Sequence, residues 1–140
     1  MNKKNIIIIL IILALFYFIY KKFMNKDKKV INDAYDNLEF ETGKAIIKNE
    51  SKPSLDILAE LLKTKNLTLT LIGHTDNVGE DADNLVLSKK RADAVKKYLV
   101  SKGVDSSNIT TIGKGENEPL VSNETEQGRA KNRRVEFIIK

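Results

Sequence analysis

Hydrophobic and polar positions divide the chain into an apolar N-terminal run and a patterned remainder. The run "IIIILIILALFYFIY", residues 6–20, holds no charged residue and has lysines on both sides. Apolar side chains cover every face of this segment, so a small domain has no interior to hide it, and it predicts a transmembrane helix. As a helix it spans about 22 Å, short of a hydrocarbon core of about 30 Å, and Phe23 and Met24 could extend it.

A signal anchor over residues 1–24 is the interpretation we prefer for this run. A cleaved signal peptide is the alternative, because the length of the run also suits one. The sequence "FYFIYKKFMNKDKK", however, offers no pair of small residues for cleavage. Residues 25–36 are polar and predict a linker, which leaves residues 37–140 as the folded domain.

The remainder of the chain switches between two periodicities. "LTLTLIG", residues 67–73, alternates with period two, which is typical of a half-buried strand, whereas "PSLDILAELLKTK", residues 53–65, repeats leucine at helical spacing. The pattern predicts strands at 37–40, 67–73, 108–115 and 133–140, a long helix from residues 80–84 to 102 with Gly103 as its C-cap, and a helical turn at 128–132. Strands that alternate with helices indicate an α/β sandwich in which helices pack on one sheet of about four strands.

Composition removes several function classes. The chain has no Cys and one His, which excludes disulfides and thiolate metal sites and makes a His-rich metal site improbable, so neither metal nor cofactor is expected. Of the 24 basic and 19 acidic residues, seven basic residues and one acidic residue lie before residue 30. The rest, with 17 basic and 18 acidic residues, is nearly neutral, so a nucleic-acid partner loses its main support.

The long helix carries an arginine on its core-facing side. With Asn84 as the origin and 100° per residue, Arg91 falls in the middle of the apolar stripe, and most of the lysines fall opposite. The same stripe holds Leu87, Ser88, Val95, Tyr98 and Leu99. A buried arginine needs a partner, and the nearest good candidate is Asp76, just past the predicted strand 67–73.

Two interpretations of Asp76 and Arg91 follow. They form an internal ion pair that only stabilises the fold, or they form a site for a zwitterion. In the second interpretation Asp76 takes an ammonium group, Arg91 takes a carboxylate bidentately, and the amide of Asn84 assists. The position fits, since ligands of open α/β sheets bind where strands end opposite helix N-termini.

Other candidate residues carry weaker signals. His74 lies at a strand end, where a lone histidine is more often a hydrogen-bonded structural residue than a catalyst, and neither a nucleophile nor a metal accompanies it. In "NRRVE" alternation sends Arg133 and Arg134 to opposite sides of a strand, so one of the two reaches the site.

The motifs "LEFETG", "IGHTDNVG", "NLVLSKKRADAVKKYL", "GKGENEP" and "GRAKNRRVEFII" stand in order over residues 37–139. This arrangement resembles the OmpA-like peptidoglycan-binding domain. The resemblance implies a mixed sheet of about four strands with helices on one face, and non-enzymatic binding of peptidoglycan through the diaminopimelate of its peptide stem. The residues that match the family's site are Asp76, Arg91, Asn84, Thr75 and Leu87, with Arg133 or Arg134 in the pocket and Phe40 at its border.

The resemblance also implies an exported domain, attached to a membrane by residues 6–20 and facing the periplasm; inner and outer membrane are both left open. The lysine distribution conflicts with export, because more lysines follow the apolar run than precede it. We follow the family, since lysines bias orientation without blocking translocation. Three alternatives remain: an envelope protein–protein module without wall binding, a hydrolase that uses His74 and Asp76, and a stator-like role. A homodimer is one option for the assembly.

Overall fold

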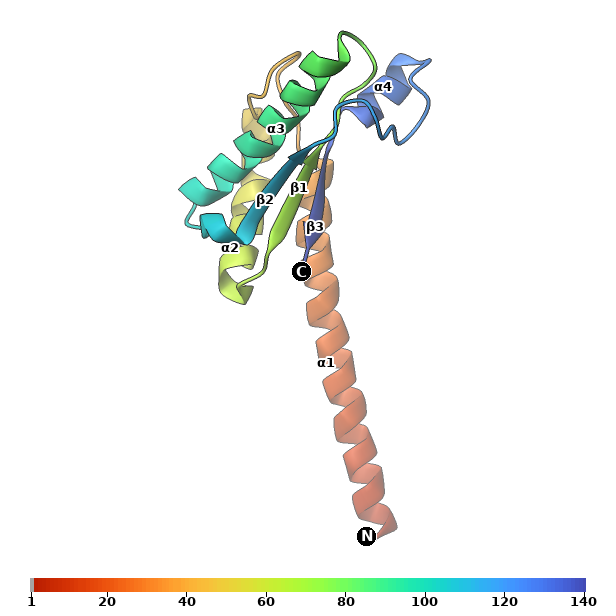
Figure 1. The fold of residues 1–140 in the computed structure, drawn as a ribbon. Helices are drawn as coiled ribbons and strands as arrows, with labels where there is room; N and C mark the ends of the chain where they lie inside the picture. The colour runs from red at the N-terminus through yellow and green to blue at the C-terminus, as the bar shows by residue number, and fades with distance from the viewer. Residues whose placement is uncertain (1) are drawn as a thin grey trace.

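A three-stranded sheet and the helices packed on it form the folded part of the chain (Figure 1). The computed structural model describes residues 2–140. In chain order the elements are α1 (Lys3–Asp36), η1 (Asn49–Ser51), α2 (Lys52–Lys65), β1 (Leu69–Gly73), α3 (Asp81–Ser101), η2 (Ser106–Asn108), β2 (Ile109–Gly113), α4 (Glu126–Asn132) and β3 (Val135–Ile139).

The sheet is mixed, with strand order β2-β1-β3. β1 pairs parallel with β2, with Leu69 opposite Ile109, and antiparallel with β3, with Leu69 opposite Ile139. Within β1, Leu69 and Leu71 are buried while Thr70 and Ile72 are half-buried on the other face. The predicted period-two alternation is therefore confirmed, and the leucines mark the face that the helices cover.

The core lies between this face of the sheet, α2, α3 and the end of α1. It is built mainly of aliphatic side chains, among them Leu55, Leu58, Leu62, Leu71, Val95 and Leu99. The stripe predicted for α3 is also confirmed, since Asn84, Ser88, Arg91, Val95 and Leu99 are all buried there. Gly103 follows α3 at φ +94°, the left-handed conformation expected of a glycine that ends a helix.

The fourth strand, predicted at residues 37–40, is not part of the sheet. Phe40 forms only an isolated antiparallel bridge with Ile47, and Gly43, at φ +67°, turns the chain between them. Backbone bonds from Glu41 N to Ile46 O at 2.9 Å and from Lys48 N to Glu39 O at 3.0 Å close this segment on itself. The backbone groups of this segment are satisfied locally, so it forms a loop, and the sheet has three strands.

The linker predicted at residues 25–36 is wrong in its conformation, because α1 continues through it. Ala34 is fully buried, and Val30 and Ile31 pack against the core, so tertiary contacts hold these polar turns helical. The Tyr35 ring also meets Phe137 of β3 edge to face at 6.1 Å between centroids. α1 is the one described helix that is long and apolar enough to cross a membrane, and none of residues 6–20 is buried.

Candidate functional site

A cavity of about 710 Å³ opens where β1 ends, bounded by the start of α3, the loop at residues 38–48 and α4. Seven of the residues predicted for the site line it, namely Phe40, Thr75, Asp76, Asn84, Leu87, Arg91 and Arg133. They come from four separate stretches of the chain. The structure thus brings together in one place residues that the sequence could relate only through spacing and resemblance.

Asp76 is held by two interactions, one to each carboxylate oxygen. Oδ1 accepts a hydrogen bond from Val78 N at 3.0 Å, which folds the chain into a turn after β1. Oδ2 accepts from Arg133 Nη1 at 2.7 Å. Only 7% of Asp76 is exposed, so this carboxylate is pre-oriented and presents its remaining acceptor capacity toward the cavity that it lines.

Arg91 is 5% exposed and makes one hydrogen bond, from Nε to Lys44 O at 3.1 Å. Its guanidinium carbon lies 5.4 Å from the centre of the Phe40 ring, a cation–π arrangement. Within residues 2–140, Nη1 and Nη2 of Arg91 have no hydrogen-bond partner, and no Arg91 nitrogen lies within 4.0 Å of an Asp76 oxygen. Burial, and secondarily the charge of Arg133, lower the pKa of Arg91, while Asp76 opposes them.

Asn84 organises the loop around the carboxylate. Its side-chain nitrogen donates to Asp76 O at 3.3 Å, to Val78 O at 3.2 Å and to Glu116 Oε2 at 2.7 Å. The amide therefore joins the first turn of α3 to two loops. Asn84 lines the cavity, but its side-chain nitrogen donates to protein oxygens, so its assisting role stays a prediction.

Thr75 presents a hydroxyl without a partner. Its residue is 3% exposed, and Oγ1 is buried with no hydrogen bond among the residues described. Buried polar atoms are rarely left unsatisfied, so an unpaired hydroxyl in the wall of a cavity is suited to a ligand's polar group. Leu87 and Phe40 add apolar surface on either side of the same cavity.

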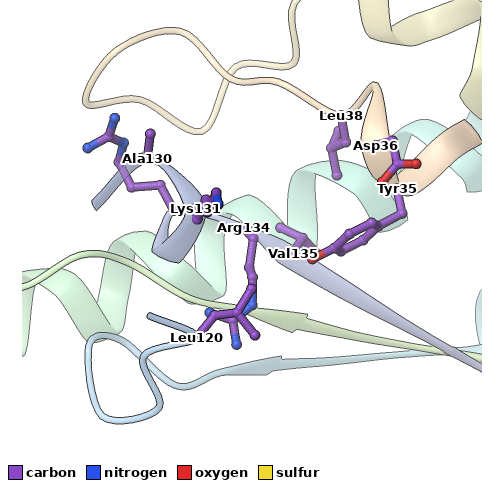
Figure 2. A pocket seen from close by; sticks show the side chains of 9 residues that line it. Tyr35, Asp36, Leu38, Leu120, Ala130, Lys131, Arg134 and Val135 are labelled. Carbon is purple, nitrogen blue, oxygen red and sulfur yellow. The ribbon is translucent and has the colours of Figure 1, made fainter. Parts of the chain in front are cut away.

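Arg133 and Arg134 point to different sides of the chain, as the predicted strand alternation expects. Arg133 lines the cavity and bridges Asp76 and Glu126, whose hydrogen bonds raise its pKa, the bond to Asp76 contributing most. Arg134 turns to the other side, where its Nε donates to Glu136 at 2.9 Å. Figure 2 shows Arg134 beside Leu120. Both line a smaller hollow of about 200 Å³, which adjoins the principal cavity and shares Leu38, Ala130 and Arg133 with it.

His74 lies behind the site and does not line the cavity. It is 1% exposed, and its Nε2 is 3.4 Å from Glu136 Oε1, too poorly aligned to count as a hydrogen bond. Burial and the nearby Arg134 lower its pKa despite the opposing charges of Glu136 and Glu118. The neutral imidazole is therefore the form that the fold favours.

Several residues of the site carry no signal in the sequence. The carbonyl of Lys44 holds Arg91, and Glu126 and Lys48 line the cavity. A backbone acceptor 47 residues away from its arginine cannot be found from periodicity, and the two charged residues resemble ordinary surface positions. In the described part of the chain, no group of three or more His, Cys, Asp or Glu residues is placed to hold a metal ion.

The lining is mixed in charge, with acids and bases side by side. The ionisable residues on the cavity wall are Glu39, Glu41, Asp76, Glu126, Lys48, Arg91 and Arg133. A site with both charges buried close together fits a ligand that itself carries both, and it disfavours a simple anion or cation.

Comparison with known proteins identifies the family of the chain. A sequence profile of the OmpA family matches residues 39–133, which contain every residue of the cavity except Leu38. The chain belongs to the OmpA family. Among curated OmpA-family relatives, Outer membrane protein A of Bordetella avium is 46% identical over 101 residues, covering 71% of this chain and 52% of the relative.

Two further relatives of the OmpA-family chain have names that mention peptidoglycan. Peptidoglycan-binding protein ArfA of Mycobacterium tuberculosis is 44% identical over 86 residues, covering 61% of this chain and 26% of ArfA. The crystal structure of the peptidoglycan-associated lipoprotein from Burkholderia pseudomallei superposes with a TM-score of 0.70 at 26% identity, covering 74% of this chain and 88% of the lipoprotein. The chain spans about half the length of the Bordetella relative and about a quarter of ArfA.

Proposed function

We propose that this OmpA-family protein is a non-catalytic peptidoglycan-binding module of the bacterial envelope. It binds the wall through the diaminopimelate of the peptide stem, and α1 tethers it to a membrane with the domain in the periplasm. The names of the mycobacterial and Burkholderia relatives support wall binding. The exposed apolar surface of α1 supports the tether.

The site chemistry supports diaminopimelate in particular. Its free end carries an ammonium and a carboxylate on one carbon. In the proposed complex, Asp76 accepts from the ammonium and the two unpaired Nη groups of Arg91 hold the carboxylate. Asn84 supports this arrangement by fixing the loop that carries Asp76, and the Thr75 hydroxyl is free to bind a further polar group of the stem.

One observation carries the proposal: Arg91 is buried beside Asp76 without pairing with it. A direct Asp76–Arg91 ion pair would use up the donors of Arg91, whereas here Asp76 pairs with Arg133 and Arg91 keeps Nη1 and Nη2 without partners among residues 2–140. The two Nη atoms are not fully enclosed by protein, so they can donate to a carboxylate that enters the cavity. The mixed charge of the cavity wall supports a zwitterion over a simple anion as the ligand.

Pull-down on purified sacculi that contain diaminopimelate tests the site. The full chain in detergent should bind, and Asp76→Asn and Arg91→Gln should each lose binding by about tenfold or more, the loss of roughly one charge-assisted contact. Matched controls are Lys90→Gln and Asp83→Asn, which make the same charge changes at exposed positions of α3. Unchanged binding by both folded site variants would rule out the assigned site.

A second comparison varies the ligand. Soluble muropeptides should bind when their stem holds diaminopimelate and bind about tenfold or more weakly when it holds lysine or diaminopimelate with an amidated carboxyl, since both lack the anion that Arg91 would hold. Arg91→Gln should then bind all three equally. Equal binding of the three muropeptides by the unaltered chain would show that the wall contact lies elsewhere.

A further inference from the structure

Five lysines lie on α1 just beyond its apolar run. We call Lys21, Lys22, Lys26, Lys28 and Lys29 the lysine collar. All five are exposed, and none makes a hydrogen bond or ion pair with any residue from 2 to 140. The only acid among them, Asp27, pairs with Lys65 of α2. The collar is therefore a strongly cationic surface without an internal partner.

The collar occupies one side of the helix. At 100° per residue its five members fall within an arc of about 160°. Val30, Ile31 and Ala34, which pack on the domain core, fall on the opposite side. The lysines thus face away from the domain, and tertiary packing fixes that orientation.

The apolar length of α1 sets where the collar meets a bilayer. Phe23 and Met24 are 62% and 40% exposed and extend the apolar surface beyond residues 6–20. A span of residues 6–24 is about 28 Å long, close to a hydrocarbon core of about 30 Å. Lys21 and Lys22 then extend outward along the helix, and residues 26–29 lie about 3 to 8 Å past the hydrocarbon edge, inside the headgroup layer.

Two contacts place the domain along α1. The Asp27–Lys65 ion pair joins α1 to the end of α2, three residues beyond Met24, and Tyr35 meets Phe137 farther up. The base of the domain, where β1 begins, therefore stands about 5 Å from the hydrocarbon edge. Asp76 lies beyond the far end of β1, which spans about 13 Å from Leu69 to Gly73. Figure 1 agrees, since α4 and the start of α3 lie at the end away from the free part of α1.

We infer that the lysine collar binds anionic lipid headgroups and seats the base of the domain on the membrane, so that the cavity opens on the side away from the lipid. The inference rests on the proposed membrane tether and is independent of the wall ligand. Charge complementarity carries it: a cationic surface with no protein partner is placed by hydrophobic length at the depth of the lipid phosphates.

The chain has no cysteine, so a single introduced thiol reports one position. Ser106→Cys, exposed in η2 just before β2, marks the base of the domain, and Glu124→Cys, exposed before α4, marks the opposite end. The full chain carrying a donor dye at either position is reconstituted into vesicles with an acceptor on a small fraction of lipid headgroups. The vesicles are phosphatidylcholine alone or phosphatidylcholine mixed with phosphatidylglycerol.

Energy transfer from position 106 should be higher in the mixed vesicles and should fall as salt is added, while transfer from position 124 stays lower throughout. Replacing Lys26, Lys28 and Lys29 by Gln should remove the difference between vesicles. Each lysine near an anionic membrane surface strengthens binding to it by about fivefold. The loss of three lysines should therefore shift the equilibrium between the membrane-bound and unbound positions of the domain on the order of 100-fold. The difference in energy transfer between the two kinds of vesicle should persist when the same three lysines are changed to Arg. It should also persist when the exposed Lys90, Lys97 and Lys131 are changed to Gln.

Equal transfer in the two kinds of vesicle, or a Gln variant that behaves like the unaltered chain, would overturn the collar as a lipid-binding surface. Extraction of the same vesicles with alkaline carbonate separates this failure from the failure of the tether. A chain that resists extraction but ignores lipid charge refutes only the collar. A chain that is extracted refutes the tether, and the collar with it.

Discussion

Asp76 is bonded to Arg133, 57 residues later in the chain, and not to the buried Arg91 of α3. Arg133 Nη1 donates to Asp76 Oδ2 at 2.7 Å, whereas no nitrogen of Arg91 comes within 4.0 Å of that carboxylate in residues 2–140. The two arginines thus have different positions in one cavity. Arg133 orients the anion, and Arg91 keeps its two Nη groups for another partner.

Arg133→Gln tests this division. About a third of the Arg133 side chain is exposed, and of its two partners Glu126 is exposed whereas Asp76 is buried, so urea unfolding of the variant accompanies the binding assay. We expect sacculus binding to fall by about threefold to tenfold, less than for Arg91→Gln, because Asp76 loses orientation but keeps its charge. Lys131→Gln, an exposed position of α4, is the matched control. A loss equal to that of Arg91→Gln would instead place Arg133 in direct contact with the ligand.

Asn84→Asp should destabilise the domain by about 2 kcal/mol, the cost of leaving buried carbonyls unpaired and adding a charge near Glu116. The Asn84 side-chain nitrogen now donates to three oxygens, including Glu116 Oε2 at 2.7 Å. Urea unfolding of the variant at neutral pH measures the loss, and the loss should shrink in acid as carboxylates are protonated. Asp83→Asn, one residue earlier and exposed, should change stability little. Stability unchanged by Asn84→Asp would contradict the loop contacts.

Gly73→Ala should open the contact between β1 and α3. A Cβ at residue 73 would lie 2.0 Å from the backbone oxygen of Ser88, so the helix must move away from the strand. We expect a loss of about 3 kcal/mol, at the upper end of overpacking effects, measured by urea unfolding. Gly113→Ala should cost less, since the nearest atoms, Cβ and N of Lys89 and Oγ of Ser88, lie at 2.8 Å rather than 2.0 Å. Equal effects of the two substitutions would contradict this packing.

The stability of the domain should fall between about pH 7 and pH 5 because of His74. Burial, with Arg134, places its folded pKa below the ordinary value of 6.5. The unfolded chain therefore binds a proton first as the pH drops, so the stabilisation present above about pH 6.5 is lost as the pH falls toward the folded pKa. Urea unfolding across this range measures the slope. His74→Gln should flatten the slope of the unfolding free energy against pH, since the chain has no other histidine. An unchanged slope in this variant would assign the pH dependence to the carboxylates.

Ala34→Glu should separate the end of α1 from the domain. Ala34 is fully buried against the core, so a glutamate there introduces an unpaired buried charge, with an expected loss of about 3 kcal/mol. Asn32→Glu makes the same acidic addition on the exposed side of the helix and should be near neutral. Hydrogen exchange in detergent should show protected amides at residues 28–36 that the Ala34 variant loses. Fast exchange there in the unaltered chain would restore the linker interpretation.

Much of the fold was available from pattern because burial imposes local periodicity. The alternation of residues 67–73 predicted β1, and the stripe through Asn84, Arg91 and Leu99 predicted which face of α3 is buried. Strand pairing and helix ends depend on contacts with segments far away in the sequence. At these features the predictions differed from the structure. Residues 37–40 have a strand-like pattern but close on Ile47 instead of joining the sheet.

By itself, the sequence determined the apolar N-terminal run, the buried faces and the residue types at the end of β1, because these follow from hydrophobicity and spacing along one segment. Only the tertiary structure decided which arginine meets Asp76, since Arg133 and Arg91 approach it from elements far apart in the chain. It also decided that residues 25–36 are helical. Their polar composition is compatible with coil, and burial of Ala34 against the core is what stabilises the helix there.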